Sequence, residues 1–353
     1  MTMPSVVPPS GPGPVVVATC TDAAAWDAYV SQAPDATGYH LWGWRDIFDG
    51  VFHHQCEYLA ATRDGRIVGV LPLVLFASAL FGRFAVSLPF VNYGGVVADD
   101  DAAAQALVAE AGRVARAHRA RHLELRHDRR RFPALAPKTH KVAMLRPLPS
   151  DADALWNDLD RKVRNQVRKA EKHQLTAFVA GREALDDFYD VFAVNMRDLG
   201  TPVYPPRLFD QVLRTFKDRA RLVIVRHGDR PVAGGFTFRW RERTEIPWAS
   251  TLREYNAMSA NNLLYWTVLK SAIADGSTMF DFGRSTPNEG TFHFKKQWGG
   301  SPVELCWEYD VVTGAVPDQS PKNPKFQMAI RTWQQLPVGL ATAIGPHIVR
   351  CIP

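Results

Sequence analysis

Apolar and polar positions along the chain follow the same order of elements twice. In the first half, two apolar runs between residues 58 and 76 are joined at Asp64-Gly65, a dipeptide typical of a two-residue β-hairpin turn. An apolar strand is predicted at 85–91, and residues 100–120 carry apolar side chains at helical spacing. A further run, HLELRH, predicts the strand that closes this unit.

The second half repeats this order, although its residues barely match those of the first. Residues 221–240 contain two apolar runs that turn at Gly228-Asp229, which predicts a second hairpin. The strand EIPWAS follows, then a helix at about 261–275, and then an apolar strand that ends in MFDFG. Hairpin, strand, helix and strand, twice over, indicate a duplicated α/β domain.

Helical spacing also opens each half, at 22–52 in the first and at 155–172 and 185–216 in the second. The predicted fold class is α/β (α+β), with two tandem domains that each contain a mixed, mostly antiparallel sheet flanked by helices. The expected segments are a disordered leader at 1–14, an N-terminal domain at 15–148, a C-terminal domain at 149–312, and a linker with a C-terminal helix that packs back on the first domain at 313–353.

The net charge of +6 and the isoelectric point near 9.2 favour an anionic partner, such as phosphates, tRNA or an anionic membrane surface. Four widely scattered cysteines lack metal-ligand spacing, which predicts reduced thiols, no metal site and a cytoplasmic protein. The longest apolar stretch, 67–82, is interrupted by Pro72 and is too short to span a bilayer. The sequence therefore predicts a soluble globular protein.

The segment FDFGRSTPNEGTFHFKKQWGG at 280–300 carries the candidate chemistry. An apolar strand contains Asp281 near its end, and a Gly-containing loop leads to an aromatic-basic run that includes Lys295. Strand ends that open into such loops bring polar groups to ligands in α/β enzymes. An ammonium held between Phe294 and Trp298 acts more strongly on developing negative charge than it would in water. The alternative interpretation is a strand, a loop and an exposed basic turn.

A basic cluster at 161–172 is predicted to lie on one helix. Arg164, Arg168 and Lys172 recur at every fourth position and form one stripe, with valines on the buried side. The stripe is a candidate site for the phosphates of tRNA or of an anionic acceptor. The alternative is a solvated face whose charges pair with nearby acids.

Further polar and aromatic residues are candidates for lining a substrate cleft. Glycines after Asn92-Tyr93 let the backbone approach a ligand, although simple turn chemistry explains the same pattern. Trp248 suits the acceptor side of a cleft and the core equally well. Arg284 follows the closing strand and can hold a carboxylate or phosphate with two hydrogen bonds. The remaining candidate substrate contacts are Arg197, Tyr204 and Lys296.

Several motifs together resemble the FemAB family of peptidyl and aminoacyl transferases. FDFGRST…GTFHFKKQWGG is similar to that family's strand-loop-FKxxFGG motif, with Trp298 in place of the second Phe. SLPFVNYGG, KVRNQVRKAEK, MRDLGTPVYP, IPWASTLREYN and the ending GPHIVR…P resemble more closely the FemAB-like branch found with exosortase/PEP-CTERM exopolysaccharide systems. The resemblance covers roughly residues 15–353. It implies two tandem acyl-CoA N-acyltransferase-like (GNAT-like) domains.

The resemblance implies transfer of an aminoacyl or acyl group to an amine on a cell-envelope precursor, as in peptidoglycan synthesis, or on an exopolysaccharide precursor. It implies that Lys295 stabilises the charge on the reacting carbonyl or on the tRNA end. The attacking ammonium must also lose a proton, for which Asp281 is the candidate acceptor, although it equally suits the orientation of a nearby lysine or arginine. No cofactor is expected, because the donor is a co-substrate, with aminoacyl-tRNA favoured over acyl-CoA. The expected acceptor is an anionic or lipid-linked small molecule.

Two sequence features bear on the substrates: one differs from some FemAB members, and the other differs from acyl-CoA enzymes of the same fold. Phe48 stands where some muropeptide-using members carry a lysine, which weakens the case for a nucleotide-diphosphate acceptor. The loop REYNAMSANN has no glycine to cradle a pyrophosphate, which disfavours acyl-CoA. The alternatives are an acyl-CoA-dependent N-acyltransferase of the same fold and a non-catalytic polysaccharide- or tRNA-binding protein. The amphipathic helix at 325–336 also suits peripheral contact with the inner membrane surface, although packing on the first domain is the favoured expectation.

Overall fold

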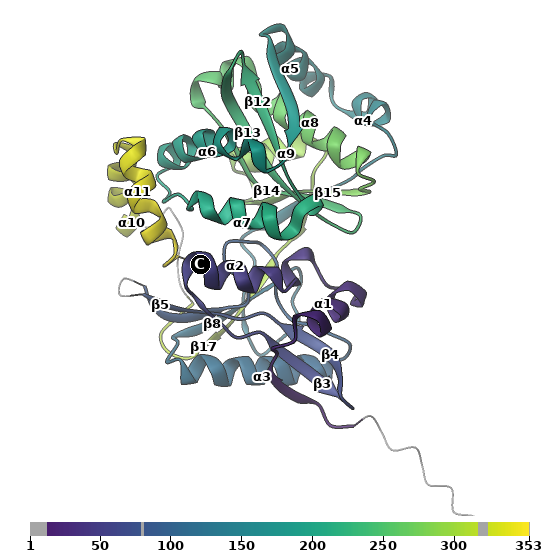
Figure 1. The fold of residues 1–353 in the computed structure, drawn as a ribbon, viewed down its shortest axis with the longest axis vertical. Coiled ribbons are helices and arrows are strands. Elements are labelled where there is room, and N and C mark those ends of the chain that lie inside the picture. Colours follow the sequence, from purple (N-terminus) through teal and green to yellow (C-terminus); the bar gives the residue numbers. More distant parts are fainter. Residues whose placement is uncertain (1–12, 79–80, 317–323, 353) are drawn as a thin grey trace, which may run out of the picture.

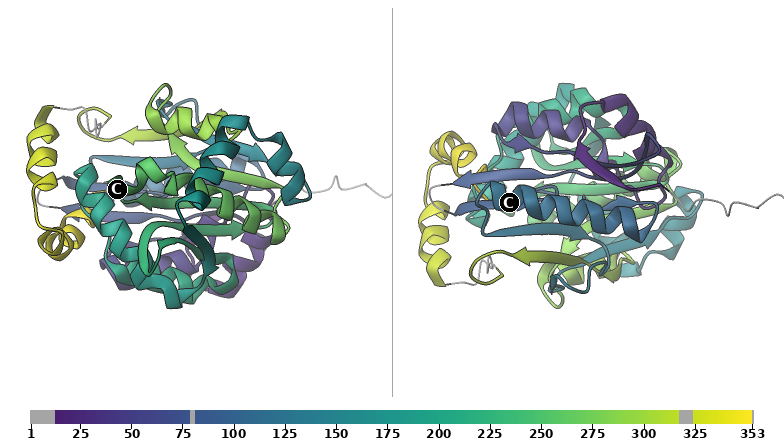
Figure 2. Two further views of the ribbon diagram at one scale, coloured as in Figure 1. Left: turned by 90° about the horizontal axis from the view of Figure 1, so that it is seen from above. Right: turned by 90° about the horizontal axis from the view of Figure 1, so that it is seen from below.

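The computed structural model describes residues 13–78, 81–316 and 324–352, and it shows two α/β halves stacked along the long axis of the molecule (Figure 1). Helices cover the faces of the sheets in both halves, as the α/β prediction required (Figure 2). The leader expected at 1–14 lies almost entirely outside these residues. None of the helices in the described ranges is long and apolar enough to cross a membrane.

The first half contains two sheets where the sequence predicted one. β4 (Arg66–Leu71) and β5 (Val74–Ser78) are consecutive but belong to different sheets, because Pro72 lies between them and offers no N–H to a ladder. One sheet has the order β1 (Val16–Thr19), β3 (Leu59–Arg63), β4, β7 (Val97–Ala98). The other has the order β2 (Gln55–Cys56), β5, β6 (Gly82–Val86), β8 (His122–His127), β17 (Cys306–Val311), β9 (Ala136–Lys138).

The local predictions for the first half are confirmed. β3 and β4 form the expected hairpin, and Asp64 and Gly65 at its turn have φ values of 52° and 75°, as this turn requires. α3 (Asp101–Ala117) fills the predicted helix at 100–120, and the Asp100 side chain caps it by accepting the N–H of Ala103. The other helices of this half are α1 (Ala23–Gln32), the short 3-10 helix η1 (Gly38–His40) and α2 (Gly43–Phe52).

The second half is built on one seven-stranded sheet. Its order is β11 (Leu175–Ala180), β12 (Ala220–His227), β13 (Arg230–Trp240), β14 (Arg243–Thr251), β15 (Met279–Ser285), β10 (Val142–Pro147), β16 (Ser301–Glu304). The predicted hairpin is confirmed, because β12 and β13 turn at Gly228-Asp229. The helices of this half are α4 (Ala152–Asp158), α5 (Arg161–Lys172), α6 (Leu185–Leu199), α7 (Pro206–Phe216), α8 (Ala260–Ala274) and α9 (Gly290–Gln297).

The two halves exchange strands. β10 precedes the boundary expected at residue 148, yet it pairs with β15 and β16 of the second sheet. β17, from the end of the expected second domain, pairs antiparallel with β8 and β9 of the first half. Sheet membership therefore does not follow the division into 15–148 and 149–312. The exchange links the two halves and fixes the loops that face each other between them.

An aromatic core crosses the junction between the halves. The Tyr39 ring stacks on that of Phe238 at 5.6 Å between centroids, and Trp44 contacts Phe216 at 5.1 Å. Figure 1 shows the helices on either side of this junction, α2 and α7, facing each other. Such aromatic pairs contribute about 0.5–1.5 kcal/mol each beyond their buried area. The core therefore holds the facing loops in a defined arrangement.

The C-terminal segment forms two helices, α10 (Pro324–Gln334) and α11 (Val338–Val349), where the sequence predicted one helix and a tail. Both pack mainly on α6 of the second half, and Ile330 lies directly against Gly200. Between the two helices, the Leu336 carbonyl accepts a hydrogen bond of 2.9 Å from Arg197. The two helices therefore pack on the second half, whereas the expectation was packing on the first domain; the residue after α11, Arg350, interacts with His54 of the first half.

Candidate active site between the two halves

The strands β14 and β15 diverge at the point where the second half faces the first. They pair in parallel only over residues 243–245 and 279–281, and Glu245 opposite Asp281 is the last pair. Beyond it, β14 continues on β13 and β15 continues on β10. Two carboxylates therefore lie side by side where the sheet opens, and both are buried.

Asp281 is held by three donors. It accepts hydrogen bonds from the Tyr93 hydroxyl at 2.9 Å and from the backbone N–H of Gly283 at 2.8 Å. Arg243 donates to the same carboxylate and lies over the Tyr93 ring at 4.7 Å. Burial and the negative charge of Asp281 raise the pKa of Tyr93 well above its usual range, so this phenol stays a donor. Asp281 is thus committed to orienting its neighbours.

Glu245 has fewer partners. It accepts a hydrogen bond of 3.2 Å from the Asn92 side-chain amide, and only 5% of the residue is exposed. Burial, and then the negative charge of Asp281, raise the pKa of Glu245 to about 8. A carboxyl with such a pKa exchanges its proton near neutral pH. Glu245 is therefore a second candidate for the proton acceptor, beside the predicted Asp281.

Lys295 approaches this pair from α9. Its ammonium donates to the carbonyls of Gly283 at 3.1 Å and Arg284 at 2.8 Å. Gly283 adopts a φ of 74°, a conformation that glycine tolerates. Gly283 lies between the Asn92 side-chain amide and the Lys295 ammonium. Burial lowers the pKa of Lys295 to about 8, and the charges of Asp281 and Glu245 oppose that shift.

The stretch around Lys295 is a helix, where the sequence predicted an irregular basic run. Phe292 and Lys295, three residues apart on α9, both face inward and are buried. Lys296 points elsewhere and lines a separate hollow of about 320 Å³ with Lys162 and Arg146. The helix therefore separates the two lysines that the sequence placed together.

A cleft of about 200 Å³ opens beside Glu245 and is lined by both halves. Tyr39 and Tyr93 come from the first half, and Phe238, Trp240 and Arg243 come from the second. The second half also fixes the loop before η1, since the Arg241 guanidinium donates to carbonyls at the end of α1 and Trp240 donates to the Ala36 carbonyl.

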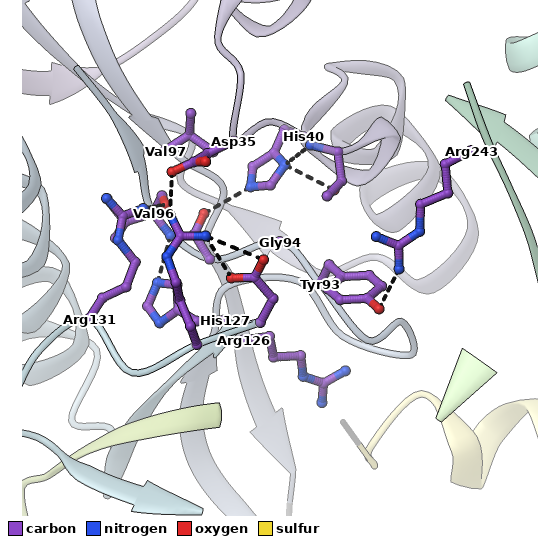
Figure 3. Close-up of a pocket in the computed structure, with 14 residues that line it drawn as sticks. Asp35, His40, Tyr93, Gly94, Val96, Val97, Arg126, His127, Arg131 and Arg243 are labelled. Carbon is purple, nitrogen blue, oxygen red and sulfur yellow. Dashed lines mark hydrogen bonds and ion pairs between the residues drawn. The ribbon is translucent and has the colours of Figure 1, made fainter. Parts of the chain in front are cut away.

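A smaller hollow of about 40 Å³ continues from this cleft past Tyr93 and Arg243. Figure 3 shows His40, His127 and Arg131 on one side of it, and Tyr93 with Arg243 on the other. Burial lowers the pKa of His40 to about 4, and its ring is held by the Gly95 carbonyl at 2.9 Å. These residues shape the wall of the hollow.

The structure brings four of the predicted site residues together. Asn92, Tyr93, Asp281 and Lys295 meet around the divergence of β14 and β15. Their spacing in the sequence is large, so the convergence comes from the packing of the two halves. Tyr93 of this group also lines the cleft between the halves.

Arg284 borders this group, because its carbonyl accepts a hydrogen bond of 2.8 Å from Lys295, and its guanidinium lies over the Trp307 ring at 5.2 Å. The remaining candidates lie apart from the group. Tyr204 and Trp248 contact each other in an aromatic cluster, at 6.3 Å between centroids. Arg197 pairs with Asp198 and holds the C-terminal helices.

The basic stripe is also distant from the cleft. Figure 1 places α5 at the end of the second half that faces away from the first half. Arg168 lies over the Trp156 ring at 5.4 Å, and Arg164 lies one turn earlier on the same helix. The stripe therefore cannot contact the carboxylate pair.

Sequence reasoning missed Glu245, Arg243 and Tyr39. The available sign was an acidic residue within the apolar strand EIPWAS, where burial is costly unless the group is used or paired. Its partners come from residues about 150 positions away, and no local pattern indicates them.

Comparisons with known proteins agree with this architecture. A family model described as an acetyltransferase (GNAT) domain matches residues 158–296. No curated protein matches the sequence. The crystal structure of FemX is similar, with a TM-score of 0.63 and 17% identity over 86% of this chain and 97% of that one.

Two other solved structures are similar at low identity. The C-terminal domain of a putative lysylphosphatidylglycerol synthetase from Agrobacterium fabrum has a TM-score of 0.56 and 10% identity, over 91% of this chain and 95% of that one. A tandem GNAT protein from the clavulanic acid biosynthesis pathway has a TM-score of 0.50 and 12% identity, over 86% of this chain and all 100% of that one. At such identities the likeness concerns the fold. The chain thus has the tandem GNAT fold, and its residues 158–296 match the model of an acetyltransferase (GNAT) domain.

Proposed function

We propose that this protein is an acyltransferase of FemAB type that forms an amide on an amine-bearing precursor. The observation that carries the proposal is the buried pair Glu245 and Asp281 next to Lys295, with Glu245 lining a cleft between the two halves. Amide formation needs a proton acceptor for the attacking amine and a cation for the developing oxyanion. This group of residues supplies both.

Glu245 takes the proton in the proposed reaction. An ammonium of the acceptor enters the cleft and loses a proton to the Glu245 carboxylate, which has a pKa of about 8. The free amine then attacks the carbonyl carbon of the donor, a C–N bond forms, and the bond from that carbon to the donor's leaving oxygen or sulfur breaks. The attacking nitrogen gives up its second proton to the leaving oxygen or sulfur as it departs, so no covalent enzyme intermediate is required.

Lys295 stabilises the negative oxygen of the tetrahedral intermediate. An ammonium has three N–H donors, and two of them hold the carbonyls of Gly283 and Arg284. The third remains for the substrate, since no further partner occurs among the described residues. Because Lys295 is largely buried, the interaction is stronger than it would be in water.

Aminoacyl-tRNA is the donor that we favour. The stretch after β14, where acyl-CoA enzymes need a flexible glycine loop for the pyrophosphate, is the 3-10 helix η4 (Arg253–Met258) without a glycine. The Ser259 hydroxyl, at the start of α8, is already hydrogen-bonded to Gln166. The motifs similar to the exosortase-associated FemAB-like branch support a cell-envelope or exopolysaccharide acceptor, and tRNA as donor places the reaction in the cytoplasm.

A cell-free transfer assay tests the proposed function. Purified protein is incubated with an extract of envelope precursors, aminoacyl-tRNAs and acyl-CoAs, and the amide product is sought by mass spectrometry. We expect a mass increment that depends on the protein and disappears after treatment with RNase. A precursor pool whose masses do not change with any donor would contradict the function.

The acyl-CoA-dependent alternative also has an observation in its favour, because the matching family model is that of an acetyltransferase domain. The same assay separates the two donors. A mass increment that survives RNase and requires acyl-CoA would replace aminoacyl-tRNA as the donor and leave the assigned residues unchanged.

The basic stripe provides a separate test of the donor. Changing Arg164, Arg168 and Lys172 to Gln should weaken tRNA binding by about tenfold or more at low salt and flatten its salt dependence, because fewer phosphate counterions are released. Arg113→Gln on α3, at the opposite end of the molecule (Figure 1), is the control. Unchanged affinity and salt slope in a filter-binding assay would show that the stripe is only a solvated face.

A further inference from the structure

Large apolar side chains are exposed on the C-terminal helix pair. On α11, Leu340 and Ile344 are 45% and 38% exposed, and they lie one turn apart on the same side of the helix. Ala343 between them is also exposed. On the neighbouring helix α10, Met328 is 78% exposed. Large apolar side chains that gather on one exposed helix face, as Leu340 and Ile344 do, are typical of an interaction site.

On α11 the small residues face the protein and the large apolar residues face outward, which is the reverse of a typical surface helix. Its small residues Ala341 and Gly345 face the protein, and Gly345 lies so close to Val203 that a Cβ would approach the Val203 backbone nitrogen to 2.8 Å. The larger apolar side chains Leu340 and Ile344 point to the outside. A helix exposed only to water would carry polar residues there. The outer face is therefore built to be covered.

The charge of the C-terminal segment after Asp318 indicates what kind of partner it binds. No Asp or Glu occurs in the sequence after Asp318, whereas the same stretch contains four Lys or Arg residues. Arg331 is exposed on α10, and His347 is exposed on α11 one turn beyond Ile344. A second copy of this face would bring like charges together, which opposes self-association. Apolar side chains flanked by cations without acids match an anionic lipid surface.

The position of the helices permits such contact. Figures 1 and 2 show α10 and α11 along one flank of the second half, outside the sheets and beside α6. Their inner faces are fixed by the Arg197–Leu336 hydrogen bond and by the amide of Gln334, which donates to the Asp198 carbonyl at 3.1 Å. The outer faces can therefore meet a flat surface without rearrangement of the fold.

We propose that the outer face of α10 and α11 binds the surface of a membrane rich in anionic lipid, with Leu340, Ile344 and Met328 inserted among the headgroups. The binding is peripheral. It does not depend on the proposed transfer reaction.

Co-sedimentation with lipid vesicles tests this proposal independently of activity. The full-length protein is mixed at low salt with vesicles of phosphatidylglycerol and phosphatidylcholine, or of phosphatidylcholine alone. We expect binding to the anionic vesicles, weaker binding to the neutral ones, and at least a roughly tenfold loss of vesicle partition in Leu340→Gln/Ile344→Gln. Arg331→Gln should reduce the preference for anionic lipid.

The matched control is Val303→Gln/Val312→Gln, which changes two valines of similar exposure outside the helix pair. It should bind vesicles as the wild type does. Absence of vesicle binding by the wild type, or an equal loss in the control, would overturn the proposal. It would also be overturned if Leu340→Gln/Ile344→Gln turned a dimer into a monomer in sedimentation velocity without changing vesicle binding, because a second copy would then cover the face.

Discussion

Glu245→Gln is expected to lower the rate of amide formation by about 10²–10⁴-fold, the usual contribution of a positioned general base. Glutamine keeps the shape of the side chain and can still accept the hydrogen bond from Asn92. It cannot take up the proton of the acceptor ammonium. The loss should appear in kcat, because Glu245 contributes to the proton transfer and not to the overall shape of the cleft.

The same substitution is expected to stabilise the fold. In the native state the pKa of Glu245 is raised from its usual range near 4.5 to about 8. Between these values the native protein holds a proton that the unfolded chain has released, so the free energy of unfolding decreases as pH rises through that window. Gln cannot ionise, so Glu245→Gln should be more stable by roughly 1–3 kcal/mol near pH 8.

Glu242→Gln is the matched control, because it makes the same chemical change at an exposed position three residues earlier. Thermal unfolding and transfer rates are measured for both variants at several pH values. A stabilised and inactive Glu245→Gln, with a control like the wild type, supports the assignment. Wild-type turnover in Glu245→Gln would remove Glu245 from the reaction.

Lys295→Ala is expected to lower turnover by about 10²–10³-fold, as the loss of one oxyanion donor does in other acyl-transfer enzymes. It should also destabilise the protein by roughly 1–3 kcal/mol, because the carbonyls of Gly283 and Arg284 lose a buried donor. Lys295→Met keeps most of the apolar stem and separates the effect of charge from that of packing.

The pH profile distinguishes a catalytic Lys295 from a structural one. The rate should rise as Glu245 deprotonates and fall as Lys295 loses its charge, and both groups have a pKa of about 8. The wild type should therefore show a narrow optimum near pH 8. Lys295→Ala should lose the falling limb, whereas Lys270→Ala, at an exposed lysine on α8, should keep it. A falling limb that persists in Lys295→Ala would limit Lys295 to a structural role.

Much of the fold could be predicted because its signals are local. The turn dipeptides Asp64-Gly65 and Gly228-Asp229 fixed both hairpins, and helical spacing identified α3, α5 and α8. The repeated order of elements then indicated two α/β halves. These features depend on neighbours within a few residues, which a pattern can contain.

The exchange of β10 and β17 could not be predicted in the same way. Each strand pairs with partners more than a hundred residues away, and the alternation of its side chains is compatible with either sheet. The helix α9 was missed because its glycine, aromatic and threonine residues have low helix propensity, and burial of Phe292 and Lys295 stabilises it instead.

The candidate site was predictable only in part. Lys295 and Asp281 lie in one motif, and Asn92-Tyr93 precede a glycine turn, so the sequence marked them. Glu245 becomes distinctive only when Asn92 and Asp281 surround it in the folded chain. Arg164 and Arg168 formed an obvious pattern, yet their helix lies far from the cleft.

The proposed role of the carboxylate pair and Lys295, between the two halves, is to catalyse amide formation between a donor and an acceptor amine. The most direct measurement is the rate of amide formation, followed by mass spectrometry with the donor and acceptor found in the cell-free assay, for wild type, Glu245→Gln and Lys295→Ala across pH 6–10. We predict product from the wild type, with an optimum near pH 8, and a loss of at least about a hundredfold in both variants. Two folded variants that form the amide at the wild-type rate would contradict the account.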